Sequence, residues 1–343
     1  MEHRKNELTN CSFVKTVLML LVVLYHSCVF WTGTWFTTYP AVSAPGLAWF
    51  AKYLNSFHIY GFALVSGYIF CYQKLEQGKY DCFLPFAANK AKRLLVPYVF
   101  TAIVWVIPVS AYFSGWNGKE IVNKYLLAAA PNQLWFLVML FVVFMGAYVL
   151  SNLFAKENIG GFLICLGFYG VGIFGGMLFP NFFQIWTACK YMVFFLLGFK
   201  QRKKGANMLS KIPAIVWVLV HVCLFALSEL LMAMDGKLFL LMHLAINLAA
   251  NVTGALMAFF VLQKIASLIS VKQNRIYRLL EQNAMVVYLL HQQIVYFVIC
   301  LLNEVIAPGI HVVVNFAIAL GLSLIVGTVL RKFRTTRFLI GEK

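Results

Sequence analysis

Long runs of apolar residues dominate the chain, and short polar segments separate them. A helix needs about 20 apolar residues to cross a membrane. The pattern predicts ten membrane-spanning helices, at residues 12–31, 47–72, 93–113, 133–151, 160–179, 183–200, 211–232, 238–263, 282–302 and 309–330. Because only short loops remain between them, we expect residues 1–343 to form a single all-α integral membrane domain.

The composition supports this interpretation. Hydrophobic residues make up 62% of the chain, charged residues only 11%, and the mean hydropathy is +0.83. Soluble domains carry about 25% charged residues, so this chain lacks the polar residues to cover a water-facing surface. The net charge of +17 would suggest nucleic-acid binding in a soluble protein. Here the basic residues lie between apolar runs, which indicates membrane topology and no nucleic-acid partner.

The positions of the basic residues predict the orientation of the helices. When the N-terminus is placed in the cytoplasm, nearly all of the 28 Lys and Arg residues fall in cytoplasmic segments. Only five fall on the outer side: Lys52, Lys119, Lys124, Lys190 and Lys237. This asymmetry follows the positive-inside rule. We therefore expect a multi-pass protein of the cell membrane with both termini cytoplasmic.

The first predicted helix carries Lys15 and His26. Eleven residues separate them, close to three helical turns, so both lie on one face about 16 Å apart. An ionisable side chain at membrane depth often marks a functional site. Lys15 could equally be a flanking charge at the inner surface, and His26 a hydrogen-bonded core residue.

Two further histidines fall near the middle of predicted spans, His58 in the second and His291 in the ninth. Three histidines from three helices could converge on one cavity, but each could also be structural. In the outer half, Glu229 and His243 could form a buried pair or could each reach the interface.

A basic cluster at residues 89–93 precedes the third span and contains Lys90 and Arg93 at i, i+3 spacing. Lys and Arg suit phosphate groups, so the pair could bind a phosphate-rich ligand such as coenzyme A. The alternative is ordinary positive-inside charge. The chain has no CxxC pair, HExxH, Walker A or GxGxxG motif, so we expect no metal site and no bound cofactor.

Several ordered motifs together resemble the acyltransferase-3 family of integral membrane acyltransferases, particularly its fucose 4-O-acetylase-like branch. The first helix is similar to that family's Arg/Lys-x10-His opening, with Lys15 and His26. The other blocks that carry the resemblance are Phe57-His58 with Ser66-Gly67-Tyr68, the run Lys90 to Arg93 before Leu94-Leu95-Val96-Pro97-Tyr98, Leu134-Trp135-Phe136-Leu137, and Tyr288-Leu289-Leu290-His291.

The resemblance implies transfer of an acetyl group from cytoplasmic acetyl-CoA, a substrate rather than a bound cofactor, to a sugar hydroxyl of an envelope, capsular or exopolysaccharide glycan. His26 would act as general base or as an acyl relay, and His58 and His291 would support the site. Lys15, Lys90 and Arg93 would hold the CoA phosphates.

Departures from the family pattern affect these expectations, among them Ile59-Tyr60-Gly61 in place of the Met-Pro-Leu that is common after the second-helix histidine. The acidic residue that often stands three positions before the Lys/Arg is Ser12 here, and the basic cluster begins with Lys90 instead of Arg. A different class of function also fits the residues: a proton-coupled transporter or flippase of a lipid-linked sugar, with the histidines as proton relays.

Overall fold

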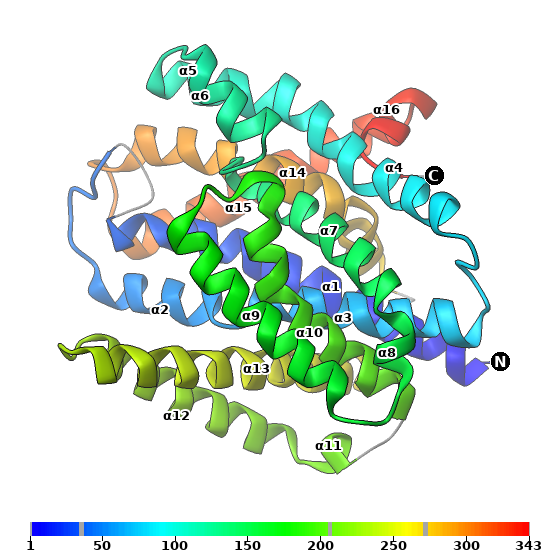
Figure 1. Cartoon of the computed structure of the whole chain (residues 1–343). Helices are drawn as coiled ribbons and strands as arrows, with labels where there is room; N and C mark the ends of the chain where they lie inside the picture. Colours follow the sequence, from blue (N-terminus) through cyan, green and yellow to red (C-terminus); the bar gives the residue numbers. More distant parts are fainter. Residues whose placement is uncertain (1, 34–37, 205–207, 270–273, 343) are drawn as a thin grey trace.

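The computed structural model describes residues 2–33, 38–204, 208–269 and 274–342. In these ranges all regular secondary structure is helical, and ten helical segments are long and apolar enough to cross a membrane (Figure 1). The predicted all-α fold and its ten spans are therefore confirmed, and the chain is a multi-pass membrane protein.

The described residues form sixteen α-helices, some of which join end to end within one span. Their bounds are α1 Glu2–Cys28, α2 Pro45–Asn55, α3 His58–Cys71, α4 Phe83–Thr101, α5 Ile107–Ser114, α6 Gly118–Ile121, α7 Trp135–Val149, α8 Ser151–Ala155, α9 Gly160–Leu178, α10 Ile185–Lys204, α11 Met208–Lys211, α12 Ala214–Met232, α13 Lys237–Leu268, α14 Arg275–Leu302, α15 Pro308–Leu330 and α16 Arg334–Leu339.

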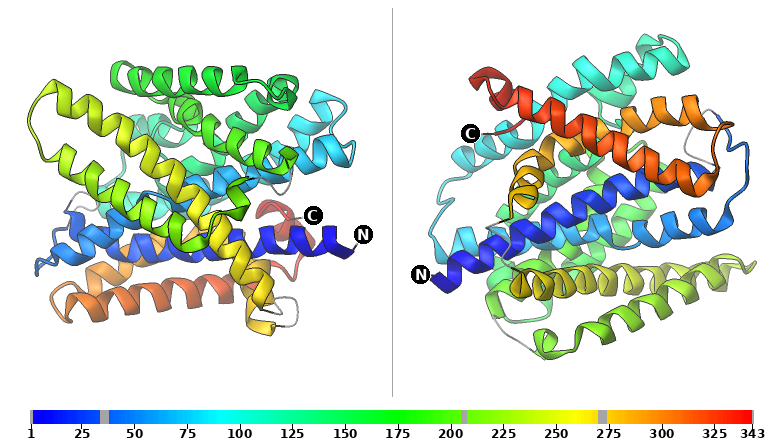
Figure 2. Two further views of the ribbon diagram at one scale, coloured as in Figure 1. Left: turned by 90° about the horizontal axis from the view of Figure 1, so that it is seen from below. Right: turned by 180° about the vertical axis from the view of Figure 1, so that it is seen from behind.

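Helices α1 and α3 lie at the centre of the bundle. α1 packs against α3, α13, α14 and α15, and α3 also packs against α10. In the span that contains α3, 72% of the residues of the apolar stretch are buried inside the protein, whereas in α9 the share is 17%. A site built on α1 and α3 is therefore enclosed by protein, whereas α9 lies at the periphery (Figures 1 and 2).

Two glycines allow α3 and α10 to touch. A Cβ on Gly67 would lie 1.9 Å from the carbonyl oxygen of Phe195, and a Cβ on Gly198 would lie 1.8 Å from that of Leu64. Close backbone approach at small residues stabilises helix pairs in membranes, where the hydrophobic effect between helices is weak. This contact fixes the position of α3.

The second span is broken in the middle, which the sequence did not predict. Ser56 and Phe57 interrupt it between α2 and α3. The Ser56 hydroxyl donates to the carbonyl of Tyr53 at 2.6 Å, and Nδ1 of His58 lies 2.5 Å from the carbonyl of Leu54. Non-helical backbone at membrane depth is tolerated where it is buried in protein and its polar groups are paired. The break places His58 at the first position of α3.

The third span begins ten residues earlier than residue 93, at Phe83. The basic cluster therefore lies inside α4 and does not precede it. Pro85 sits in the first turn, where a proline removes no helical hydrogen bond. The helix extends to the N-terminal side of the apolar run because its backbone hydrogen bonds do not depend on apolar side chains.

The N- and C-termini lie at the same end of the bundle (Figures 1 and 2). An even number of spans requires this arrangement. Which side of the membrane they occupy stays a prediction.

Candidate functional site

The structure brings two of the predicted histidines into direct contact. Nε2 of His291, on α14, lies 3.1 Å from Nδ1 of His26, on α1, and the two ring centroids are 4.9 Å apart. His291 is fully buried, whereas His26 is half-buried. Residues 265 positions apart in the sequence therefore share one site.

His58 joins this pair through an aromatic ring. Tyr25 lies with its ring centroid 4.9 Å from that of His26 and 5.1 Å from that of His58. The three histidines thus converge around Tyr25, which sequence reasoning did not single out. Its position directly before His26 was the only signal available.

Backbone carbonyls orient all three imidazole rings. In His26, Nδ1 lies 2.9 Å from the carbonyl oxygen of Val22. In His291, Nδ1 lies 2.9 Å from the carbonyl oxygen of Val287. His58 makes the equivalent contact with Leu54. A carbonyl only accepts hydrogen bonds, so we assign the proton of each neutral ring to Nδ1 and the lone pair to Nε2. The N–H of His26 is then shared between Val22 and Nε2 of His291, and Nε2 of His26 is the basic nitrogen.

A cavity of about 660 Å³ lies between the histidines and the end of the bundle that carries the chain termini. The three predicted phosphate-binding residues, Lys15, Lys90 and Arg93, all line it. They come from α1 and α4, and their role in binding phosphate stays a prediction. The ammonium of Lys90 lies 3.7 Å from the ring centroid of Phe144, a cation–π contact that holds it against one wall.

An acidic residue from another helix lies close to Lys15. Glu281, near the start of α14, lines the same cavity and interacts electrostatically with Lys15. The family pattern often has an acid three positions before the lysine, where this chain has Ser12. Tertiary structure therefore supplies a carboxylate that the local sequence lacks.

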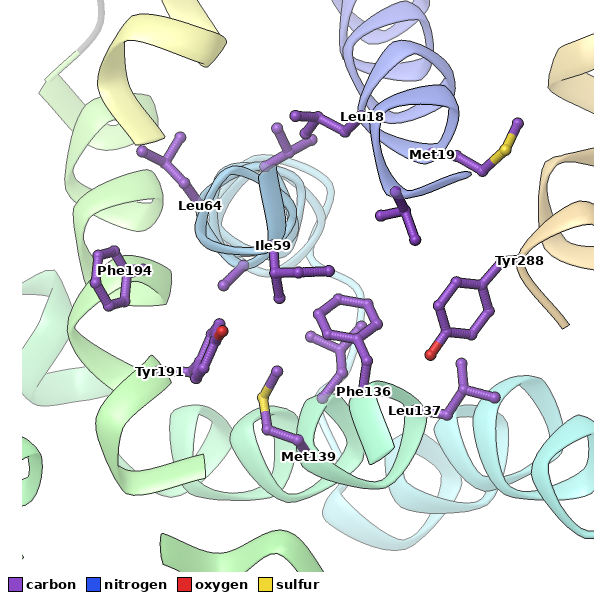
Figure 3. Close-up of a cluster of buried hydrophobic side chains, with 14 of the residues drawn as sticks. Leu18, Met19, Ile59, Leu64, Phe136, Leu137, Met139, Tyr191, Phe194 and Tyr288 are labelled. Carbon is purple, nitrogen blue, oxygen red and sulfur yellow. The ribbon is translucent and has the colours of Figure 1, made fainter. Parts of the chain in front are cut away.

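An apolar layer separates this cavity from the histidines, which do not line it. Met19, Phe136 and Tyr288 line the deep part of the cavity and are themselves buried (Figure 3). Met19 lies seven residues before His26, about 10 Å along the helix axis. The ring of Tyr288 lies 6.1 Å from that of His291, and its hydroxyl donates to the carbonyl of Gln133. Tyr288 is thus in contact with both the cavity and the histidine pair.

A second, basic pocket of about 550 Å³ adjoins the cavity. Arg93, Arg337, Gly341 and Glu342 line both. Its cationic residues are Lys92, Arg93, Lys332, Arg334 and Arg337, with Glu342 as the one acid among its lining residues. The sequence analysis assigned the C-terminal cations to membrane topology and did not place them beside Arg93, because only the packing of α16 against α4 brings them there.

Another group of ionisable residues lies near α2, α12 and α13. Glu229 pairs with Lys52 at 2.9 Å, and Nδ1 of His243 lies 2.9 Å from the carbonyl of Ser228. Glu229 and His243 therefore have different partners. Within the described ranges, no group of three or more His, Cys, Asp or Glu residues could hold a metal ion.

Comparisons with known proteins identify the family. Residues 11–332 match the acyltransferase-3 family, described as an acyltransferase domain. Comparison with curated proteins and with solved structures finds no match. The matched range contains the three histidines, Lys15, Lys90 and Arg93, but not α16. With nearly its whole length matched and ten membrane-spanning helices, the chain belongs to the acyltransferase-3 family and is a membrane acyltransferase.

Proposed function

We propose that this acyltransferase moves an acetyl group from cytoplasmic acetyl-CoA to a sugar hydroxyl of a cell-envelope glycan, with His26 at the reacting centre. The contact between His26 and His291 carries the proposal. It lies beyond the deep end of a cavity whose opposite end is basic. In the described spans, His26 is the histidine whose Nδ1–H points to a second imidazole, and Nε2 of that imidazole accepts the hydrogen bond.

The donor would enter from the side on which the termini lie. The nucleotide phosphates suit the basic pocket around Arg93 and Arg337, because guanidinium groups bind phosphate oxygens bidentately. The uncharged pantetheine arm suits the cavity beyond Lys15. To reach His26 the thioester must pass Phe136 and Tyr288, so we infer that these two side chains move when acetyl-CoA binds.

In one route, His26 acts as a general base. Nε2 takes the proton of the sugar hydroxyl as its oxygen attacks the thioester carbonyl. The tetrahedral intermediate then breaks the C–S bond, and the departing thiolate receives that proton from His26. His291 accepts a hydrogen bond from Nδ1–H throughout, so it holds the ring and stabilises the imidazolium.

An acyl relay uses the same atoms in a different order. Nε2 of His26 attacks the thioester carbonyl, the C–S bond breaks, and CoA leaves as the thiolate. The sugar hydroxyl then attacks the acetyl-imidazolium, the C–N bond breaks, and the hydroxyl proton is released to water, from which the thiolate is protonated. Either route requires Nε2 of His26, and we propose no choice between them.

The orientation in the cell membrane follows from the same reasoning. The basic pocket lies with the termini, and acetyl-CoA is a cytoplasmic metabolite. We therefore propose that both termini and α16 are cytoplasmic, as the distribution of Lys and Arg predicts.

The test uses purified protein, radiolabelled acetyl-CoA and a glycan acceptor. We expect His26→Ala to lose about 10²–10⁴-fold in acetyl transfer, the range that general acid–base catalysis contributes. His243→Ala is the matched control, because His243 lies in α13 and bonds to Ser228 away from the cavity. Transfer by His26→Ala at the wild-type rate would refute the assignment. Sugar crossing liposomes without acetylation would instead favour a transporter.

A further inference from the structure

Helices α5 and α6 lie at the end of the bundle opposite the termini (Figure 1), and their residues line a polar pocket. Its volume is about 270 Å³, and α5, α6 and α14 contribute to its walls. Ligand pockets for drug-sized molecules span about 300–1,000 Å³. This pocket is slightly smaller than that range, so it suits a small unit such as one sugar ring.

One wall of the pocket presents alternating donors and acceptors. The hydroxyls of Ser110 and Tyr125 lie 2.9 Å apart, and Nδ2 of Asn132 donates to each of them at 3.2 Å. Burial raises the pKa of Tyr125, so its phenol stays protonated and can donate. Such a wall matches a ligand with several neighbouring hydroxyl groups.

Aromatic rings form another part of the lining. The rings of Phe113 and Tyr296 meet edge-on with centroids 6.2 Å apart, and both residues line the pocket. An apolar ring surface beside hydroxyl-binding groups suits a sugar, whose C–H faces are apolar and whose edges are polar.

The charges at the pocket cancel. Its two charged lining residues, Glu120 and Lys124, form an ion pair with each other. A phosphate or a uronic acid would find no unpaired cation among the described lining residues. This is the reverse of the basic pocket at the other end, and it favours an uncharged ligand.

One glutamine beside the histidine pair reaches a residue that lines this pocket. Gln292, next to His291, donates through Nε2 to the hydroxyl of Tyr296 at 2.6 Å. Gln292 is only 3% exposed, and its Oε1 has no hydrogen-bond partner among the described residues. An unpaired buried carbonyl costs free energy unless a ligand or water satisfies it. Tyr296 follows His291 by five residues, about 7.5 Å along α14.

We propose that this pocket binds the acceptor of the reaction, a single uncharged sugar unit, and that Ser110, Tyr125, Asn132 and Tyr296 recognise its hydroxyls. The inference rests on the proposed function. Donor and acceptor then approach the histidine pair from opposite ends of the bundle, the donor through a basic entrance and the acceptor through a neutral one.

The experiment measures acceptor binding separately from transfer. Neutral methyl hexosides and a methyl glucuronide are tested against the full-length protein in nanodiscs, by saturation-transfer NMR without acetyl-CoA and by transfer of radiolabelled acetyl groups. The variant is Ser110→Ala with Tyr296→Phe. Tyr112→Phe is the control, because Tyr112 lies on the same helix as Ser110 but is 75% exposed and does not line the pocket.

We expect the double variant to raise the KM for a neutral hexoside at least tenfold and to weaken its NMR signal, with the KM for acetyl-CoA unchanged. Tyr112→Phe should match the wild type. An unchanged acceptor KM in a folded double variant, equal binding of the glucuronide, or no binding of any neutral hexoside would overturn the inference. Hexoside binding that the double variant weakens, but that leads to no acetylation in the wild type, would overturn the proposed function while leaving the pocket intact.

Discussion

Two polar clusters in the described spans, one around His221 and one around His26 and His291, differ in what surrounds the second ring nitrogen. In the α2–α12 cluster, Nδ1 of His221 lies 3.0 Å from the carbonyl of Ala250 and Nε2 lies 3.2 Å from the hydroxyl of Ser56. Gly254 packs so closely that a Cβ there would lie 2.6 Å from the His221 ring. Both nitrogens are occupied by the protein's own groups, and no space remains for a substrate.

In the α1–α14 cluster, formed by His26 and His291, the partner of one imidazole is another imidazole. His26 is half-buried, and the cavity ends one apolar layer away. The comparison shows that burial of a histidine at membrane depth does not by itself indicate function. What distinguishes the two clusters is whether the polar contacts are completed within the protein or lead toward a cavity.

The clusters also differ in how they serve the helix break. His221 holds Ser56, whose hydroxyl is bonded to Tyr53, so the α2–α12 cluster stabilises the interruption of the second span. His58, two residues later, faces Tyr25 and the α1–α14 cluster. The interruption between α2 and α3 is therefore stabilised by His221 on one side, and on the other side it directs His58 toward the proposed site.

Removing His291 should give the largest effect that separates the clusters. We expect His291→Ala to reduce turnover about 10²-fold, because the His26 ring loses the acceptor that orients it. His291→Gln should recover part of the rate, since the amide oxygen can accept the same hydrogen bond. Steady-state kinetics at matched expression provide the measurement. Equal activity of His291→Ala and wild type would show that the contact has no role in turnover.

A smaller effect should follow from removing the lysine in the cavity. We expect Lys15→Met to raise the KM for acetyl-CoA about tenfold, the equivalent of one charge-assisted hydrogen bond of about 1.5 kcal/mol. Lys52→Met is the matched control, because Lys52 forms an exposed ion pair with Glu229 in the other cluster. Such pairs contribute little, so its kinetics should be unchanged. A similar KM in both variants would contradict the donor site.

The smallest effect should come from His221. We expect His221→Ala to lower the free energy of unfolding by about 1 kcal/mol, within the range of hydrogen bonds between membrane helices. Turnover per folded molecule should stay at the wild-type value. A thermal unfolding assay in detergent, paired with activity normalised to folded protein, measures both quantities. A loss of turnover without a loss of stability would place His221 in the catalytic machinery and end the contrast between the clusters.

The sequence by itself determined the membrane fold. Its ten apolar runs specify ten helices because backbone polar groups in a bilayer must be paired within the segment. It also placed Lys15 and His26 on one face of the first helix, since helical periodicity is local. The family resemblance named Lys15, Lys90 and Arg93 together, and these residues line one cavity, but their role in binding CoA phosphates stays a prediction.

Tertiary structure alone decided which side chains from distant helices meet. The contact of His26 with His291, the approach of Glu281 to Lys15, and the joining of α16 to Arg93 all depend on helix packing. The break at Ser56 and Phe57 is likewise stabilised by a partner on α12, 165 residues away. Hydropathy reports how each segment meets the lipid, but contacts between helices depend on small residues and paired polar groups whose partners lie far along the chain.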